Sequence, residues 1–237
     1  AHLLDLRARI LKAILSVLIV LVALLPFSRH LYGWLAQPLI ERLPHGSHMI
    51  AIEVASAFLT PLKFALVVAL FVAMPAVLYQ LWAFISPGLY RHEKRLALPL
   101  LGSAVLLFYT GCAFAYFWVL PAAFRFLALN TPNGVSMMTD IGKYLDFVLT
   151  MFFAFGFCFE VPVAVVLLVA LGVVTPVRLR AARRYVIVAT FVVAAVLAPP
   201  DILSMIMLAI PMILLYEAGV FTSAALVRSR ELRHHTL

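Results

Sequence analysis

Long apolar runs separated by short polar connections dominate the chain. The runs lie at about residues 13–27, 64–85, 96–120, 144–171, 185–198 and 202–227. A helix needs about 20 apolar residues to cross a bilayer. The fifth run has only 14 residues, which is about 21 Å of helix. The pattern predicts an all-α membrane protein with six transmembrane helices, of which the fifth is short.

We expect the whole chain, 1–237, to form a single polytopic membrane domain. Its predicted spans cover about residues 10–28, 62–86, 96–122, 143–171, 184–199 and 201–227, and structured external loops cover 29–61 and 123–142. The first loop contains an amphipathic stretch at 31–43, and Thr60 followed by Pro61 is typical of a helix start. Asp140 and Asp201 are predicted to cap the fourth and sixth spans.

Composition supports the membrane class. Hydrophobic residues make up 65% of the 237 positions and charged residues 12%, about half the charged share of a soluble protein. Cys112 and Cys158 both lie inside apolar runs. We interpret them as small core residues rather than as a disulfide or a metal pair.

The distribution of lysine and arginine predicts the orientation. If the N-terminus is cytoplasmic, 13 of the 18 cations fall on the cytoplasmic side, as the positive-inside rule requires. They are Arg7, Arg9, Lys12, Arg91, Lys94, Arg95, Arg178, Arg180, Arg183, Arg184, Arg228, Arg230 and Arg233. Both termini are therefore predicted to be cytoplasmic. The net charge of +8 is a topology signal that requires no nucleic-acid partner.

Glu160 is the only charged residue between Phe147 and Leu171. A carboxylate at this depth costs roughly 2.5–3.5 kcal/mol, and Pro162 would weaken the helix at the same level. Two interpretations stay open: a protonated carboxyl bonded to a neighbouring helix, and a functional group facing water or a protein interior.

Other polar residues have simpler interpretations. Gln80, inside the second span, is predicted to make an interhelical hydrogen bond. Lys63, Asp146 and Glu217 lie near predicted span ends, where long side chains can reach the interface.

Two carboxylates lie at the predicted cytoplasmic face. Asp5 belongs to an amphipathic N-terminal helix, four residues from Arg9, with which it can pair. Glu93 follows the Pro87-Gly88 turn among cations. It is either a neutralising surface charge or an acceptor for a bidentate guanidinium.

Enzymatic chemistry finds no support in the sequence. It contains no H-E-x-x-H, no G-x-S-x-G, no P-loop and no Cys/His cluster. We therefore predict neither enzyme activity nor a cofactor nor a metal site.

Several blocks occur in a familiar order. They are HLLDLRAR (2–9), PAVLYQLWAF (75–84), PGLYRHEKR (87–95), FGFCFEVP (155–162), PPD (199–201) and LAIP (208–211). Together they make the chain resemble, over essentially its whole length, TatC, the multispanning receptor subunit of the twin-arginine protein translocase.

The resemblance implies a function. It implies a receptor and scaffold that binds signal peptides with two adjacent arginines and helps export folded proteins across the bacterial inner membrane, using the proton gradient. It implies a concave, glove-like bundle with short fifth and sixth spans and with Glu160 facing the hollow. The implied recognition residues are Asp5 and Glu93, supported by Arg7, Arg9, Phe84, Leu89 and Tyr90.

The resemblance also implies partners. These are the single-span subunits TatA and TatB, membrane lipid, and further copies of the chain in a larger complex. Docking maps to Asp201, Ser204 and Met205 near the start of the sixth span, where relatives tend to carry glutamine after the serine. Relatives usually carry glutamate where Asp5 stands, and they share the loop proline found here as Pro38.

A second class of function is a proton-coupled transporter of small solutes with Glu160 as its relay. Such transporters are commonly built from inverted repeats with paired broken helices. We find no such repeat in the sequence.

Overall fold

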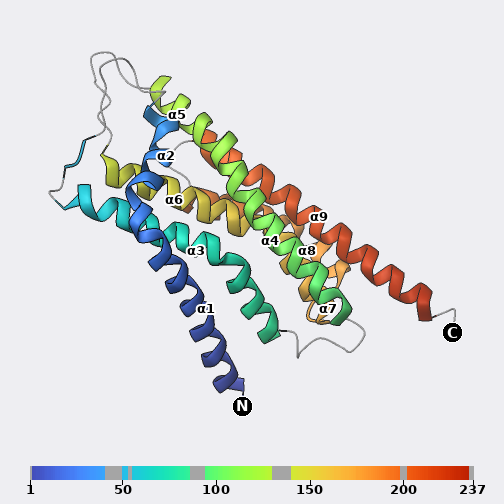
Figure 1. Cartoon of the computed structure of the whole chain (residues 1–237). Helices are drawn as coiled ribbons and strands as arrows, with labels where there is room; N and C mark the ends of the chain where they lie inside the picture. Colours follow the sequence, from blue (N-terminus) through green and yellow to red (C-terminus); the bar gives the residue numbers. More distant parts are fainter. Residues whose placement is uncertain are drawn as a thin grey trace. The chain divides into compact units, whose positions relative to one another are not determined.

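The computed structural model describes most of the chain as helix (Figure 1). The described residues are 2–40, 50–52, 55–85, 94–129, 140–197 and 202–234. Within them the only extended pairing is an isolated bridge between Ile50 and Asp140. The structure confirms the predicted all-α membrane class.

Within the described residues, five helical segments are long and apolar enough to cross a membrane, judged by length and composition. They are Leu6–Trp34, Phe58–Phe84, Leu98–Phe126, Ile141–Ala170 and Met205–Ser229. Helix α8, Pro176–Leu197, corresponds to the short fifth run and is not among them. Four arginines in its first nine residues leave it the shortest apolar stretch.

The chain divides into two compact units. Unit 1 consists of Ala1–Phe84 and Leu120–Met151, and unit 2 of Ile85–Val119 and Phe152–Leu237. Unit 1 holds α1 (His2–Leu24), the 3-10 turn η1 (Leu25–Phe27), α2 (Ser28–Ile40), α3 (Ser56–Ile85), α5 (Leu120–Leu129) and the first part of α6 (Ile141–Cys158).

Aromatic side chains connect the helices of unit 1. The Tyr32 hydroxyl of α2 donates to the carbonyl of Ile141, at 3.4 Å, and the Tyr32 ring meets Phe64 of α3 edge to face at 6.2 Å. On α5, Phe124 packs against Tyr144 of α6 with ring centroids 5.6 Å apart. Tyr32 therefore joins α2 to both α3 and α6.

Two expectations for the first external loop need correction. Helix α3 begins at Ser56, so Thr60 is not its N-cap and Pro61 lies inside the helix. The Ala55 carbonyl accepts the first hydrogen bonds of the helix. Pro61 has no backbone N–H, so it removes one hydrogen bond from the helix. Pro38, placed by the sequence in the structured external loop 29–61, lies in α2, so the amphipathic stretch is helical as far as Ile40.

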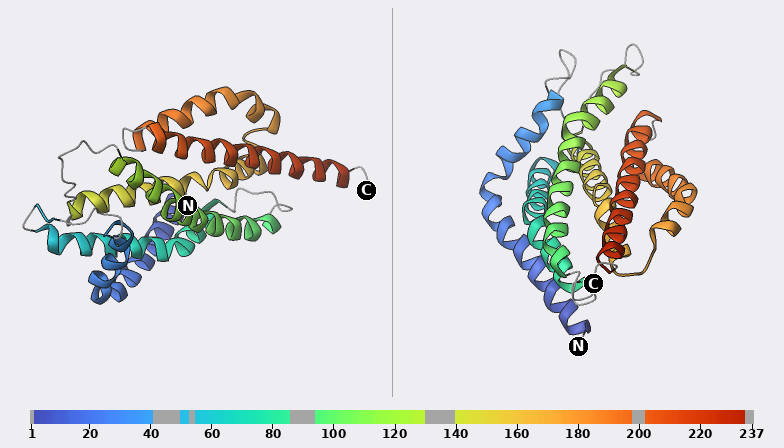
Figure 2. Two further views of the ribbon diagram at one scale, coloured as in Figure 1. Left: turned by 90° about the horizontal axis from the view of Figure 1, so that it is seen from above. Right: turned by 90° about the vertical axis from the view of Figure 1, so that its right-hand side faces the viewer.

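Unit 2 holds α4 (Lys94–Phe114), the π-helical turn η3 (Ala115–Val119), the rest of α6, α7 (Val161–Ala170), α8 and α9 (Ile202–His234). Figure 2 shows α8 and α9 side by side as an antiparallel hairpin. Helix α7 also packs along α9. The core of this arrangement consists of Val165, Val169, Leu179, Tyr216 and Val220.

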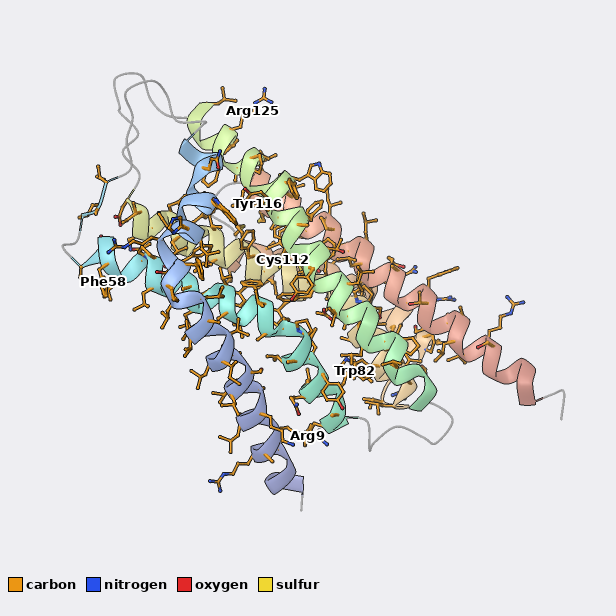
Figure 3. All side chains as sticks on the ribbon, viewed as in Figure 1. Arg9, Phe58, Trp82, Cys112, Tyr116 and Arg125 are labelled. Carbon is orange, nitrogen blue, oxygen red and sulfur yellow. The ribbon has the colours of Figure 1, made fainter. Side chains whose placement is uncertain are left out.

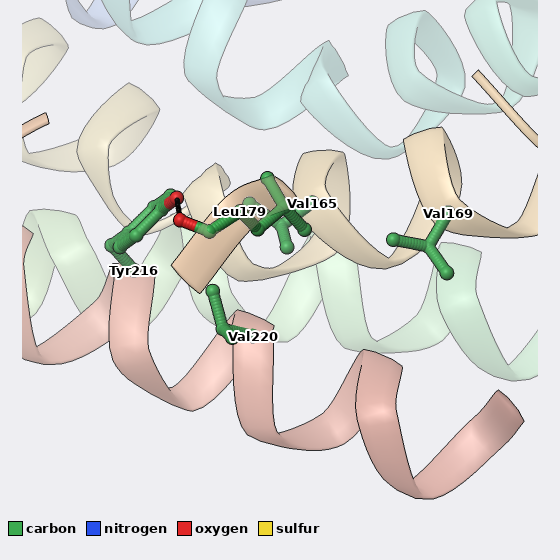
Figure 4. Packing of buried hydrophobic residues seen from close by; sticks show 5 residues of the cluster. All are labelled: Val165, Val169, Leu179, Tyr216 and Val220. Atoms are coloured by element: carbon green, nitrogen blue, oxygen red, sulfur yellow. Dashed lines mark hydrogen bonds between the residues drawn. The ribbon is translucent and has the colours of Figure 1, made fainter. Parts of the chain in front are cut away.

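One hydrogen bond fixes α8 to α9 inside this core (Figure 4). The Tyr216 hydroxyl donates to the Leu179 carbonyl at 2.8 Å, and both residues are buried. A buried phenol needs such an acceptor, since water is excluded from its surroundings.

Helix α4 crosses α6 at two glycines. A Cβ on Gly111 would clash with the backbone carbonyl of Phe155, whose carbon would lie 2.9 Å away. A Cβ on Gly156 would lie 2.7 Å from the Phe108 ring. Small residues permit this close approach. In a membrane, helices associate through such close packing, because lipid tails are as apolar as the side chains and give no hydrophobic driving force.

We predict that Gly111→Ala destabilises the protein by about 1–3 kcal/mol, because the added methyl meets rigid backbone. The measurement is the midpoint of thermal unfolding in detergent. Gly102→Ala, on the same helix with nothing within 4 Å, is the matched control. It should be neutral or slightly stabilising. Equal midpoints for the two variants would contradict the close crossing.

Candidate functional site

The fourth predicted span is interrupted at its centre. Helix α6 ends at Cys158, Phe159 and Glu160 form a turn, and α7 begins at Val161. Pro162 occupies the first turn of α7, where its missing N–H is tolerated. The predicted weakening of the helix at Pro162 is therefore present as a break.

Glu160 stands at the N-cap position of α7, but its side chain makes no capping bond. Its backbone carbonyl accepts from Ala164 N at 2.9 Å, so only the carboxyl group is unused. The side chain is half-buried, and Oε1 is fully buried without a hydrogen-bond partner among the described residues. The break thus presents an acceptor inside an apolar segment.

Aromatic residues of α4 and α6 surround the break. Phe114 lies 5.5 Å from Phe155 and 5.8 Å from Phe159, measured between ring centroids. Figure 3 labels Cys112 and Tyr116 on the same stretch of chain. The Tyr116 ring lies 6.4 Å from Phe152, and Cys112 Sγ lies 4.0 Å from the carbonyl oxygen of Phe152.

Helix α9 meets the same break through Gly219. A Cβ there would lie 2.9 Å from Pro162 Cα and 3.1 Å from Val165 Cβ. Sequence reasoning missed this contact. The available signal was a glycine inside a helix, where it costs about 1 kcal/mol relative to alanine unless packing requires it.

Lys63, Asp146 and Glu217, the three charges predicted near span ends, take part in two ion pairs. Lys63 on α3 pairs with Asp146 on α6 in unit 1. In unit 2, Arg183 on α8 pairs with Glu217 on α9 at 2.6 Å. All four side chains are between 39% and 54% exposed. These charges connect helices, a role that the sequence did not indicate.

The predicted recognition residues are only partly described. Arg7 is exposed and Arg9 half-buried, both on α1 (Figure 3 labels Arg9), and Phe84 is half-buried near the end of α3. Leu89, Tyr90 and Glu93, like the side chain of Asp5, lie outside the described residues. Their grouping stays a prediction.

The remaining predicted positions are spread over both units. Gln80 is half-buried on α3, and its expected interhelical hydrogen bond is not found within the described part of the chain. On α9, Met205 is half-buried. Asp201 and the Ser204 side chain lie outside the described residues, although α9 does begin directly after Asp201. No group of three His, Cys, Asp or Glu side chains suited to a metal occurs in the described ranges.

Comparisons with known proteins give the family. The model of the family "Sec-independent protein translocase protein (TatC)" matches residues 1–211. The chain belongs to the TatC family. It is 56% identical to a TatC of Azotobacter chroococcum over 98% of this chain and 90% of that protein, and 52% identical to a TatC of Escherichia coli K12 over 97% and 90%.

A solved structure agrees with this assignment. The crystal structure described as "Twin Arginine Translocase Receptor- TatC" superimposes with a TM-score of 0.82 at 37% identity, covering 95% of this chain and 99% of that one. As a member of the TatC family, the chain is a multispanning component of a protein-transport system. The small-solute transporter considered from the sequence is set aside.

We predict that the Lys63–Asp146 pair holds α3 to α6. Lys63→Met should lower the thermal midpoint in detergent, at a cost of about 1 kcal/mol, because Asp146 then loses its cation and partly exposed ion pairs contribute at most about this much. The exchange Lys63→Asp with Asp146→Lys should restore most of the loss. The control Lys143→Met removes an exposed lysine that lies on α6 and should have little effect. Equal losses for Lys63→Met and Lys143→Met would argue against the pair.

Proposed function

We propose that the chain is the receptor and scaffold of a twin-arginine translocase. It would bind signal peptides carrying two adjacent arginines and help export folded proteins. The observation that carries this proposal is the match to the TatC receptor structure over 95% of this chain and 99% of that one. Full-length similarity supports a shared role better than a shared motif does.

We assign recognition to Asp5 and Glu93. Two guanidinium groups need two carboxylate acceptors for bidentate bonding. Asp5 precedes the exposed Arg7 on a helix that continues unbroken to Leu24, which supports a fixed position for its backbone. Glu93 immediately precedes α4, which begins at Lys94. Arg7, Arg9, Phe84, Leu89 and Tyr90 would complete the surface around the two acceptors.

The membrane orientation follows from charge. With both termini in the cytoplasm, 13 of 18 cations face the cytoplasm, and Asp5 and Glu93 face the same compartment. The localisation is the bacterial inner membrane. A cytoplasmic receptor surface is what a precursor made in the cytoplasm requires.

Partner subunits would dock beside α9. We propose that TatA and TatB contact the region of Asp201, Ser204 and Met205, and that further copies of the chain join the complex. Met205 is half-buried and apolar, so docking here would depend on packing rather than on a polar contact.

Glu160 would serve the transport step. Its buried Oε1 has no partner in the described part of the chain, and an acceptor in an apolar segment gains most from a donor that enters with water or a guest peptide. The chain would need no cofactor and no catalysis of its own, since the proton gradient would supply the energy.

Removal of the Glu93 carboxylate tests the recognition site. We predict that Glu93→Ala abolishes photocross-linking of a twin-arginine peptide to the inserted protein, because one guanidinium loses its acceptor. The control is Glu231→Ala, which removes a carboxylate from the C-terminal part of α9. Glu231 is not one of the predicted recognition residues, so cross-linking should stay unchanged.

The peptide provides a second control. A peptide with two lysines should cross-link weakly to the unmodified chain, since lysine cannot form the bidentate contact. Undiminished cross-linking in Glu93→Ala would remove Glu93 from the site.

A further inference from the structure

Arginine side chains gather where α8 begins. Arg178, Arg180, Arg183 and Arg184 fall within its first nine residues, and all four are exposed. The α7–α8 connection leads directly into this turn, with Gly172 in the left-handed region at φ +72°. Thr175 Oγ1 accepts from Arg178 N at 3.4 Å, so the helix start is already capped from within the chain.

A fifth arginine lies toward the same end of unit 2. Val227 on α9 and Val174 in the α7–α8 connection both pack against the buried cluster that contains Leu179. Arg228 follows Val227 and is exposed, so it lies at the same end of unit 2 as the start of α8. We call Arg178, Arg180, Arg184 and Arg228 the arginine cluster.

The described side chains neutralise little of this charge. Glu217 pairs with Arg183 at 2.6 Å. Arg184 lies over the ring of Tyr185, with its Cζ 4.9 Å from the centroid, and donates to the Tyr185 hydroxyl at 3.2 Å. The four members of the arginine cluster have no ion pair with a described carboxylate. Like charges four residues apart on a helix, such as Arg180 and Arg184, repel each other, and an anion between them would relieve this repulsion.

Apolar residues continue from the cluster along the exposed face of α8. Val188 and Val192 lie four and eight residues after Arg184, hence on the same face, and they are 64% and 58% exposed. Tyr185 is also 64% exposed, and exposed tyrosine beside arginine is typical of the headgroup level of a membrane. The face is thus cationic at one end and apolar over the next two turns.

We propose that the arginine cluster binds the headgroup of an anionic phospholipid. The phosphate would lie between the guanidinium groups of Arg180 and Arg184, which are one helical turn apart, and an acyl chain would lie along Val188 and Val192. Guanidinium forks match phosphate geometry. An acidic peptide would satisfy the charges but would leave the apolar face without a match, so the amphipathic ligand fits better.

Lipid retention by the purified full chain tests this site. The probe is phosphatidylglycerol in mixed micelles, with phosphatidylcholine as the uncharged counterpart, and bound lipid is counted by native mass spectrometry. Arg180→Gln with Arg184→Gln should weaken phosphatidylglycerol binding roughly ten- to thirty-fold, the effect of two near-surface charges. Phosphatidylcholine binding should not change.

The matched control is Arg125→Gln with Lys143→Gln, which removes two exposed cations from α5 and α6. It should leave phosphatidylglycerol binding unchanged. Millimolar inorganic phosphate should not displace the lipid, because it lacks the acyl contact.

A gain of binding provides an independent measurement. Glu217→Gln releases Arg183 to the cluster and should strengthen phosphatidylglycerol binding several-fold. This variant matters because loss of cytoplasmic arginines can disturb membrane insertion. An equal loss in the control pair, or a weaker site in Glu217→Gln, would overturn the proposal. The proposal would also be overturned if the Arg180→Gln, Arg184→Gln variant still bound phosphatidylglycerol but no longer bound an acidic peptide.

Discussion

The interior of a bilayer supplies no water to polar groups, so a spanning chain has to satisfy its own donors and acceptors. Most polar contacts in this protein follow from that constraint. The hydroxyls of Thr110 and Thr150 donate to carbonyls four residues earlier in their own helices, at 2.7 Å each. Tyr216 uses a carbonyl of the neighbouring helix instead. The buried Oε1 of Glu160 is the exception within the described chain, and the proposal that it serves transport rests on this.

The same solvent also removes the usual reason for helices to associate. Lipid tails are as apolar as the side chains, so contact must come from shape and from backbone proximity. Gly111 and Gly156 provide it between α4 and α6, and Gly219 provides it between α9 and α7. Each glycine faces backbone or a ring of its neighbour. Glycines at the helix crossings therefore contribute to the packing of unit 2 alongside its buried aromatic side chains.

The fold class could be predicted because apolar length is a local property of the sequence. The break at Glu160 could be predicted for the same reason, since Pro162 acts on its own helix. Contacts between distant segments could not. Lys63 and Asp146 are 83 positions apart, and Arg183 and Glu217 are 34 apart, so no spacing links them. Even a local signal was wrong at Thr60 and Pro61, because the helix begins at the carbonyl that accepts its first bonds rather than at the proline.

The shortness of α7 has a consequence for biosynthesis. Ten residues of helix reach only about 15 Å, so α7 crosses a bilayer only as the continuation of α6 in the segment Ile141–Ala170. Its apolar side chains Val165 and Val169 are buried with Tyr216 and Val220 of α9, which leave the ribosome some fifty residues later. Until then the α9 side of this core is missing, and among its buried residues outside α7 only Leu179 of α8 can reach it earlier. A nascent chain paused between these helices would expose an unfinished surface, and the insertion machinery would have to shelter it until α9 arrives.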